Sequence, residues 1–194
     1  LHPQYNLADM MFRGKKLKDI IMYGPENVGF ISGGSGIQEL ANMTRTQVLD
    51  LIQKLVELDQ FADVIIVDTG AGISDTVLEF VAASEDVLLV ATPEPTSITD
   101  AYALLKTLNK RVSANPEKTV VKMIANQVHG NRDAKELFDK LGMVVSKFLD
   151  IKVEYIGAVP YDHNMQKAIM KQTPISILDP HSNTASSKKY CRSY

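Results

Sequence analysis

The feature that most constrains the fold is a series of short runs of branched apolar residues separated by helix-like stretches. These runs are NVGFIS (27–32), DVIIVD (63–68), DVLLVAT (86–92), TVVKMIAN (119–126) and VEYIGAV (153–159). Three of them are almost continuously apolar, as expected of parallel strands that are covered on both faces. The runs therefore predict the strands of one buried sheet.

Helical patterns fill the intervals between these runs. Residues 44–59 place apolar side chains at spacings of three and four, which predicts a helix with one buried stripe. Residues 97–111 begin with SITD, which resembles a capping box. Further helices are expected at 74–83 and at 131–149, where Gly142 is a candidate break. The alternation predicts an α/β fold: a mostly parallel sheet with helices on both faces and right-handed crossovers.

Composition and charge narrow the class of protein. The 194 residues, 45% apolar and 23% charged, suit one soluble globular domain. We expect this domain to span 1–178, followed by a polar tail at 179–194. The net charge of −2 does not indicate nucleic-acid binding. No apolar run approaches the ~20 residues that span a bilayer, and no signal-peptide pattern is present. We therefore expect a cytoplasmic protein.

The carboxyl end of the run at 63–68 is the first candidate site. Ligands of parallel sheets gather beyond the carboxyl ends of the strands. Here Asp68 is followed by Thr69, Gly70, Ala71 and Gly72. A carboxylate at a strand end can hold magnesium through water, and small residues let backbone N–H groups approach a phosphate. A simple turn in which Asp68 caps the next helix is, for this pattern alone, the commoner outcome.

Two further strand ends carry polar residues. Asn126 ends the run at 119–126, and its amide offers a donor and an acceptor that match the edge of adenine. Pro160, Tyr161 and Asp162 follow the run at 153–159, where they could flank a base. Each has a plainer explanation, since Asn forms turns and Asp162 could be a helix N-cap.

Taken in order, these segments resemble the MinD/ParA group of deviant P-loop ATPases. The resemblance rests on DVIIVDTGAGISD, DVLLVATPEPTSITDAYALLK, MIANQV and IGAVPYDHNMQKAIMKQTPI. DTGAGIS, LHPQYNLADMMFRGKKLKDII and VGFISGGSG are most similar to the flagellar-number regulators of the FlhG, FleN and YlxH type. The resemblance to this group implies a three-layer, P-loop NTPase-like fold that binds ATP and Mg²⁺. It also implies a homodimer with the nucleotide between its subunits, and slow ATP hydrolysis.

The resemblance also implies roles for single residues. Asp68 would support Mg²⁺ through water, and the Gly70–Gly72 loop, with Ala71, would sense the γ-phosphate. Asn126 would bind adenine, and Pro160, Tyr161 and Asp162 would form the base pocket. Pro93 and Glu94 would lie near the nucleotide and the dimer interface.

One motif of the family is missing from the sequence. The phosphate loop, KGGxGK[ST], has no counterpart, and the nearest glycine cluster, GGSG at 33–36, is followed by Gln38 and Glu39. In the family this loop precedes the segment that matches Leu1, by roughly 30 residues or more. We therefore expect an N-terminally truncated domain without a complete catalytic site. Alone, it should bind ATP poorly or not at all and have no ATPase activity.

Other classes of protein fit less well or remain open. Iron–sulfur relatives of this fold need cysteine pairs, whereas Cys191 is the single cysteine. Tyrosine kinases of the fold carry tyrosine-rich tails, which the two tyrosines Tyr190 and Tyr194 resemble only weakly. The four histidines show no ligand spacing, so no transition-metal site is expected. A nucleotide-independent interaction module remains the alternative function.

The resemblance suggests partners as well. Besides a second copy of the chain, a flagellar GTPase or a division regulator is a candidate. Relatives often end in an amphipathic helix that binds membranes, but SSKKYCRSY has no apolar stripe. Attachment to a membrane through this tail is therefore not predicted. The full-length protein could still be a peripheral membrane protein.

Overall fold

The computed structural model describes the chain in two compact units. The described residues are 3–34, 40, 42–70, 72–112 and 120–187. The first unit spans Leu1–Ala83 and the second spans Ser84–Tyr194. Each unit has its own buried residues, and each is described here by itself.

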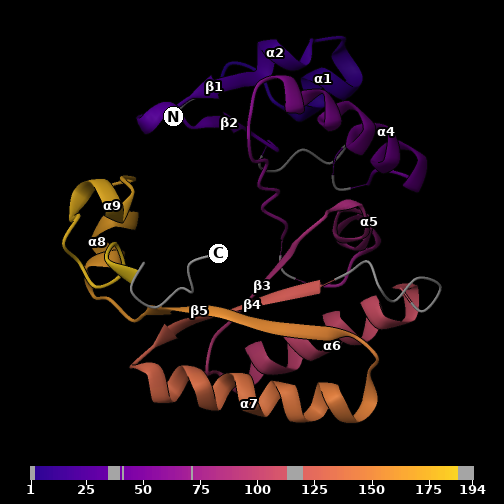
Figure 1. The fold of residues 1–194 in the computed structure, drawn as a ribbon. Coiled ribbons are helices and arrows are strands. Elements are labelled where there is room, and N and C mark those ends of the chain that lie inside the picture. The colour runs from indigo at the N-terminus through magenta and orange to yellow at the C-terminus, as the bar shows by residue number, and fades with distance from the viewer. Residues whose placement is uncertain (1–2, 35–39, 41, 71, 113–119, 188–194) are drawn as a thin grey trace. The chain divides into compact units, whose positions relative to one another are not determined.

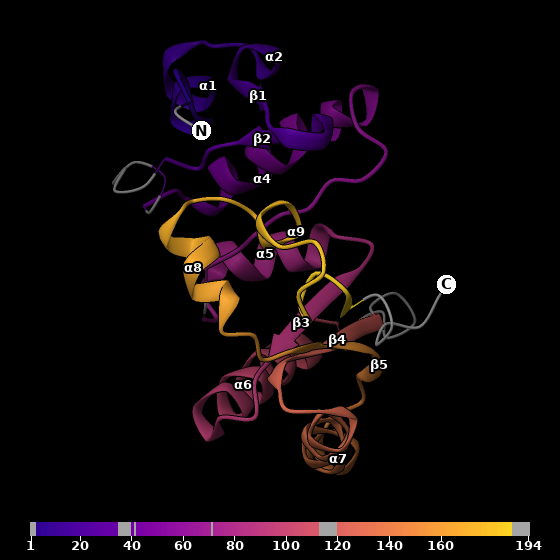
Figure 2. The same ribbon diagram turned by 90° about the vertical axis from the view of Figure 1, so that its left-hand side faces the viewer.

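The first unit combines short helices with a two-stranded hairpin (Figure 2). Its elements are α1 (Leu7–Arg13), α2 (Leu17–Ile20), β1 (Ile21–Tyr23), η1 (Pro25–Asn27), β2 (Gly29–Ile31), α4 (Arg45–Leu55), η2 (Val56–Gln60) and α5 (Asp75–Ala83). A small core joins α1, α2, α4 and η2 through Met10, Leu17, Ile20, Leu51 and Leu58. The apolar stripe predicted over 44–59 thus faces a core, although its last turn is a 3-10 helix.

The predicted strand at 27–32 belongs to an antiparallel hairpin, so the expectation of a parallel strand was wrong there. β2 pairs with β1, with Ile21 opposite Ile31 and Tyr23 opposite Gly29. Only η1 connects the two strands. A connection this short reverses the chain, whereas a parallel pair needs a crossover of a dozen or more residues.

The predicted strand at 63–68 was also wrong as a strand assignment. Residues 64–70 have no regular secondary structure, and all of them are exposed. Val64 and Ile66 are 75% and 79% exposed. Branched apolar residues favour an extended backbone, but a strand exists only when its N–H and C=O groups pair with a neighbour. No described residue forms a ladder with this segment.

The second unit contains the parallel sheet that the sequence predicts. Its elements are β3 (Val87–Ala91), α6 (Pro95–Val112), β4 (Val120–Val128), α7 (Asn131–Phe148), β5 (Lys152–Pro160), α8 (Asn164–Met170) and α9 (Ile175–Leu178). The strand order is β3-β4-β5, and both pairings are parallel. The strands predicted at 86–92, 119–126 and 153–159 therefore form within two residues of their expected ends.

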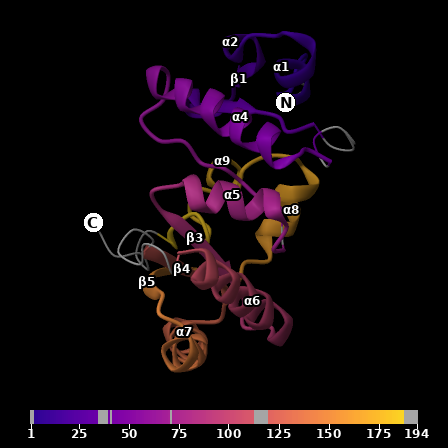
Figure 3. The ribbon, with the colours of Figure 1, turned by 90° about the vertical axis from the view of Figure 1, so that its right-hand side faces the viewer.

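Helices lie on both sides of this sheet. α6 and α7 lie side by side along one face, whereas α8 and α9 lie beyond the carboxyl end of β5, on the opposite side (Figures 1 and 3). Side chains that point toward α6 and α7 are buried, among them Leu89, Val121 and Met123. Leu88 and Val90 point the other way and are 51% and 53% exposed within the structure. The helical layer is therefore more complete on the α6–α7 side.

Two helix details differ from the sequence expectation. α6 begins at Pro95 rather than at Ser97, because proline fits the first turn of a helix, where its missing N–H costs nothing. Ser97 nevertheless acts locally, since its Oγ accepts a hydrogen bond from the backbone N–H of Thr92 at 2.9 Å. Gly142 does not break α7, which continues through it to Phe148.

A bulge interrupts the β4–β5 ladder near its carboxyl end. The register shifts between Asn126 and Val128, and Gln127 has a φ of 56°. Before the bulge, the buried positions of β4 alternate as Val121, Met123 and Ala125. One extra residue in a strand reverses which positions face inward. Consequently Gln127 is exposed and Val128 is buried, at 2% exposure.

No helix among the described residues is both long and apolar enough to cross a membrane.

Candidate functional site

The loop after the unpaired segment is the candidate site of the first unit. Asp68 is exposed, and its carboxylate contacts no other described side chain as a hydrogen bond or ion pair. It does not cap α5, which begins at Asp75 and whose first turn is bonded by the hydroxyl of Ser74. The carboxylate is thus free to accept a ligand from solvent. A single exposed carboxylate suits Mg²⁺ that keeps most of its waters.

The glycines of this loop have open surroundings. Gly72 has a φ of +114°, a conformation that side chains disfavour, whereas no such φ occurs at Gly70. A Cβ on either glycine would meet no atom within 4 Å. The backbone at both positions is therefore accessible, which a phosphate-binding turn requires. Ala71, the third predicted residue of this loop, lies outside the described residues, as do residues 35–39, which include the last two residues of the GGSG cluster.

A separate candidate site lies in the second unit, where β4 and β5 end. The backbone N–H of Tyr161 donates to the carbonyl of Val128 at 2.9 Å, which ties the two strand ends together. A hollow of about 220 Å³ opens there. Its lining residues come from both strand ends and from the C-terminal segment: Val128, His129, Gly130, Ala158, Pro160, Tyr161 and Asn183. Of the four predicted base-pocket residues, Pro160 and Tyr161 line it.

Aromatic rings form one wall of this hollow. The ring of Tyr161 lies 5.4 Å from the ring of His129 and 5.0 Å from that of His163, centroid to centroid. The contact with His163 is edge-on. Rings at these separations attract one another and hold each other in place. The wall thus offers a fixed aromatic surface, a common platform for stacking a nucleobase.

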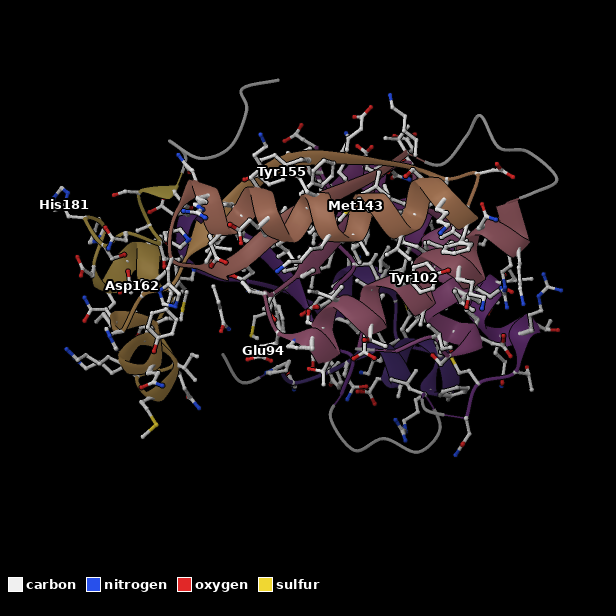
Figure 4. All side chains as sticks on the ribbon, turned by 90° about the horizontal axis from the view of Figure 1, so that it is seen from below. Glu94, Tyr102, Met143, Tyr155, Asp162 and His181 are labelled. Atoms are coloured by element: carbon white, nitrogen blue, oxygen red, sulfur yellow. The ribbon has the colours of Figure 1, made fainter. Side chains whose placement is uncertain are left out.

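Asn126 and Asp162 lie beside the hollow but do not line it. The Oδ1 atom of Asn126 accepts a hydrogen bond from the N–H of Gln127 at 3.0 Å, so part of its hydrogen-bonding capacity is used at the bulge. The amide NH₂ remains available as a donor. Asp162 lies toward the α8 end of the unit (Figure 4).

The carboxylate of Asp162 organises the chain around the hollow. It accepts hydrogen bonds from the N–H of Asn164 at 2.9 Å and from the N–H of Thr184 at 3.2 Å. These backbone donors favour the ionised form and lower the pKa of Asp162 below its usual range. Asp162 thus joins the start of α8 to the C-terminal segment.

Pro93 and Glu94 lie at another strand end of the same unit. They connect β3 to α6, and the carbonyl of Glu94 accepts the N–H of Ile98 at 3.1 Å. Glu94 is exposed, so its carboxylate is accessible to a partner. The hydroxyl of Thr92 is buried beside them and lacks a hydrogen bond among the described residues. This is the carboxyl edge of the sheet, where ligands of α/β proteins bind.

Comparison with known proteins identifies the group. The sequence matches the family model described as ParA, NUBPL iron-transfer P-loop NTPase, over residues 19–192. This match covers most of the chain. The chain belongs to the ParA family of P-loop NTPases. The resemblance to the MinD/ParA group that the strand-end motifs indicate is thereby confirmed.

Relatives of this ParA-family chain include flagellar proteins. It is 38% identical to the antiactivator FleN of Pseudomonas aeruginosa over 185 residues, which cover 95% of the chain and 65% of FleN. It is 29% identical to the flagellum site-determining protein YlxH of Helicobacter pylori, over 86% of the chain and 55% of YlxH. The chain therefore spans less than two thirds of these relatives, and the match agrees with the flagellar branch.

The fold of the ParA-family chain agrees with a solved structure. A ParA family ATPase from Chlorobium tepidum superposes with a TM-score of 0.72 at 20% identity, over 96% of this chain and 74% of that one. At this identity the likeness shows the fold alone. The predicted α/β class is confirmed.

Sequence reasoning missed two residues of the hollow. His129 follows β4, and a strand predicted to end at 126 left it in the adjoining loop. Asn183 falls in the predicted polar tail, where nothing in the sequence indicates its proximity to Tyr161. The signal that could have found His129 is that His129 and His163 each follow a strand end within three residues, at Val128 and at Pro160, and both rings contact Tyr161.

The described residues are compatible with Mg²⁺ and a nucleobase as ligands. No group of three or more metal-ligating side chains occurs among the residues that the structure covers. Mg²⁺ does not require one, since it is commonly held by one or two carboxylates and phosphate oxygens. The hollow is smaller than the roughly 300–1,000 Å³ of drug-sized sites, and so suits a single planar base rather than a whole nucleotide.

Proposed function

We propose that the protein acts in an ATP-dependent dimerisation switch that regulates the number or placement of flagella. The observation that supports this most is the 38% identity to FleN over 95% of the chain. An aromatic hollow at the carboxyl edge of the parallel sheet adds a structural reason, because it lies where nucleotides bind in α/β proteins.

Candidate residues for this switch occur in both units, and the role of each is proposed separately. Asp68 would hold Mg²⁺ through water, and the accessible backbone at Gly70 and Gly72 would respond to the γ-phosphate. Asn126 would donate its free NH₂ to the base, while Tyr161 would support the base from one side. Mg²⁺, when bound, would supply charge that stabilises the phosphates, and Asn126 and Tyr161 would orient the base.

A phosphate-binding motif that the sequence lacks limits the ATPase activity that this chain can have. It contains no GxxxxGK[ST] run, whose backbone and lysine supply most phosphate binding in P-loop proteins. We therefore propose that the 194-residue chain alone hydrolyses no ATP and binds Mg²⁺–ATP weakly. Isothermal titration calorimetry measures this directly, and tight binding of Mg²⁺–ATP would contradict it.

A substitution in the chromosomal gene of the source organism tests the function. Asp68→Ala should change the number or position of flagella counted by electron microscopy, because the metal-supporting carboxylate is lost. Asp63→Ala is the matched control, since Asp63 is an exposed carboxylate at the start of the same segment. Normal flagella in the Asp68→Ala strain, at normal protein levels, would refute the proposal.

A nucleotide-independent interaction module is the second candidate, favoured by the missing phosphate-loop motif. Its partner would be a flagellar GTPase or a division regulator. Iron transfer, which the family description mentions, is not proposed because the sequence holds one cysteine, Cys191, outside the described residues. If Asp68→Ala leaves flagella unchanged while deletion of the gene alters them, the interaction module becomes the better explanation.

A further inference from the structure

Asn183 lines the hollow and has no role in the proposed switch. It is exposed, and its side-chain amide makes no hydrogen bond with any described residue. An amide of this kind retains two donors and an acceptor for a ligand. To select one ligand over another, the amide must also be held in a fixed position.

The residues on both sides of Asn183 are held in place. Ser182 is buried, its N–H donates to the carbonyl of Asp179 at 3.0 Å, and its Oγ accepts the N–H of Ala185 at 3.1 Å. Thr184 donates its N–H to Asp162 at 3.2 Å and its hydroxyl to the carbonyl of Pro160 at 3.3 Å. The backbone of Asn183 is therefore fixed from both directions.

Residues 160–162, at the end of β5, also position the aromatic surface of the hollow. Tyr161 lies between the two residues that Thr184 contacts, and its own N–H is bonded to Val128. Residues 160–162 therefore position both the aromatic surface and the segment that carries the Asn183 amide. A stacking surface beside an amide edge is the arrangement that recognises a planar base by both its face and its hydrogen-bonding edge.

We propose that Asn183 determines which purine the hollow accepts, by pairing its amide with the N6 and N7 atoms of adenine. This inference rests on the proposed nucleotide-binding function. Adenine presents a donor at N6 and an acceptor at N7, which complement the amide oxygen and the amide NH₂. Guanine presents two acceptors on that edge, O6 and N7, so the amide oxygen would face an acceptor. The selectivity for adenine follows from this mismatch.

Nucleosides test the proposal without involving phosphates, Mg²⁺ or dimerisation. Binding of adenosine, guanosine and 7-deazaadenosine to the 194-residue chain is measured by NMR titration. A bidentate pair contributes discrimination of roughly 5- to 150-fold, so adenosine should bind more tightly than guanosine by a factor in this range. 7-Deazaadenosine, which lacks the N7 acceptor, should bind more weakly than adenosine.

Substitutions then assign the effect to Asn183. Asn183→Ala should bring the three nucleosides to nearly equal affinity, and Asn183→Asp should weaken adenosine further, because a carboxylate faces N7 with an acceptor. His181→Ala is the control: this exposed side chain lies in the same segment but does not line the hollow. It should leave the preference unchanged. Retained hydrogen-exchange protection of the Thr184 amide in every variant shows that the segment keeps its position.

Each possible result supports or overturns the inference. Loss of the adenosine preference in Asn183→Ala, with retained binding, supports it. An adenosine preference that survives Asn183→Ala overturns it while leaving the hollow as a base site. Absence of adenosine binding to the unsubstituted chain overturns it too, whereas the proposed function stands or falls on the flagellar phenotype of Asp68→Ala.

Discussion

Removal of the Asp162 carboxylate should weaken the attachment of the C-terminal segment around Thr184 to the end of β5. The carboxylate accepts the N–H groups of Asn164 and Thr184 at 2.9 and 3.2 Å. Hydrogen bonds to a charged group contribute about 1.5–3 kcal/mol each when buried. Because Asp162 is half-buried, water replaces part of each bond, and the two together should contribute about 2 kcal/mol. Asp162→Ala should lower the free energy of unfolding by that amount, with Asp162→Asn in between.

Acid should have the same effect on the unsubstituted chain. The pKa of Asp162 is lowered in the folded state, so its stabilising contribution is complete above the usual Asp value of about 3.9. That contribution is lost as the pH falls below 3.9 and through the lower folded-state pKa. Asp162→Asn cannot be protonated in this way and should not show this step.

Hydrogen exchange of the Thr184 amide is the assay that isolates this contact. Its protection should drop about 30-fold in Asp162→Ala, which corresponds to 2 kcal/mol, while amides in β4 keep theirs. Urea unfolding followed by circular dichroism gives the global value. Equal protection of the Thr184 amide with and without the carboxylate would refute the account of Asp162 as the link to the C-terminal segment.

Three other substitutions test the fold. Leu105→Ala, in a fully buried position of α6, should cost about 2–5 kcal/mol in urea unfolding, and a cost below 1 kcal/mol would contradict its place in the core. Gly72→Ala should cost about 1–3 kcal/mol because of its φ of +114°, whereas the matched Gly70→Ala should be nearly neutral. Ile66→Lys should reduce self-association measured by analytical ultracentrifugation, since an unpaired apolar segment invites strand pairing between copies; unchanged association would assign it to another surface.

The sequence was most informative where local pattern and tertiary pairing agree. The runs that became β3, β4 and β5 are branched and apolar, and each finds a parallel neighbour, so pattern and structure coincide. The run at 63–68 has the same pattern but no described partner, and partners are not written in a single segment. The hairpin at β1–β2 failed for the opposite reason, because a short turn imposed antiparallel pairing on a run expected to be parallel.

The candidate site could be predicted only from strand ends. Tyr161 follows a recognisable strand and does line a hollow at the sheet edge. Asn183 lies more than twenty residues further along, and it reaches that hollow through hydrogen bonds from Thr184 to Asp162 and Pro160. Such contacts depend on the path of the chain through α8 and α9. No periodicity in the sequence encodes that path.

The bulge at Gln127 has a consequence for comparing this chain with its relatives by length. Deleting Gln127 would leave Val128 at a position that still faces inward, so the strand could become regular without exposing its core residues. Because a bulge sets two residues of one strand against one of its neighbour, Val128 would keep its pairing with Pro160. His129 and Gly130 would then keep their places in the lining of the hollow. A relative with one residue fewer between Ala125 and the start of α7 should therefore lack the bulge and retain the hollow.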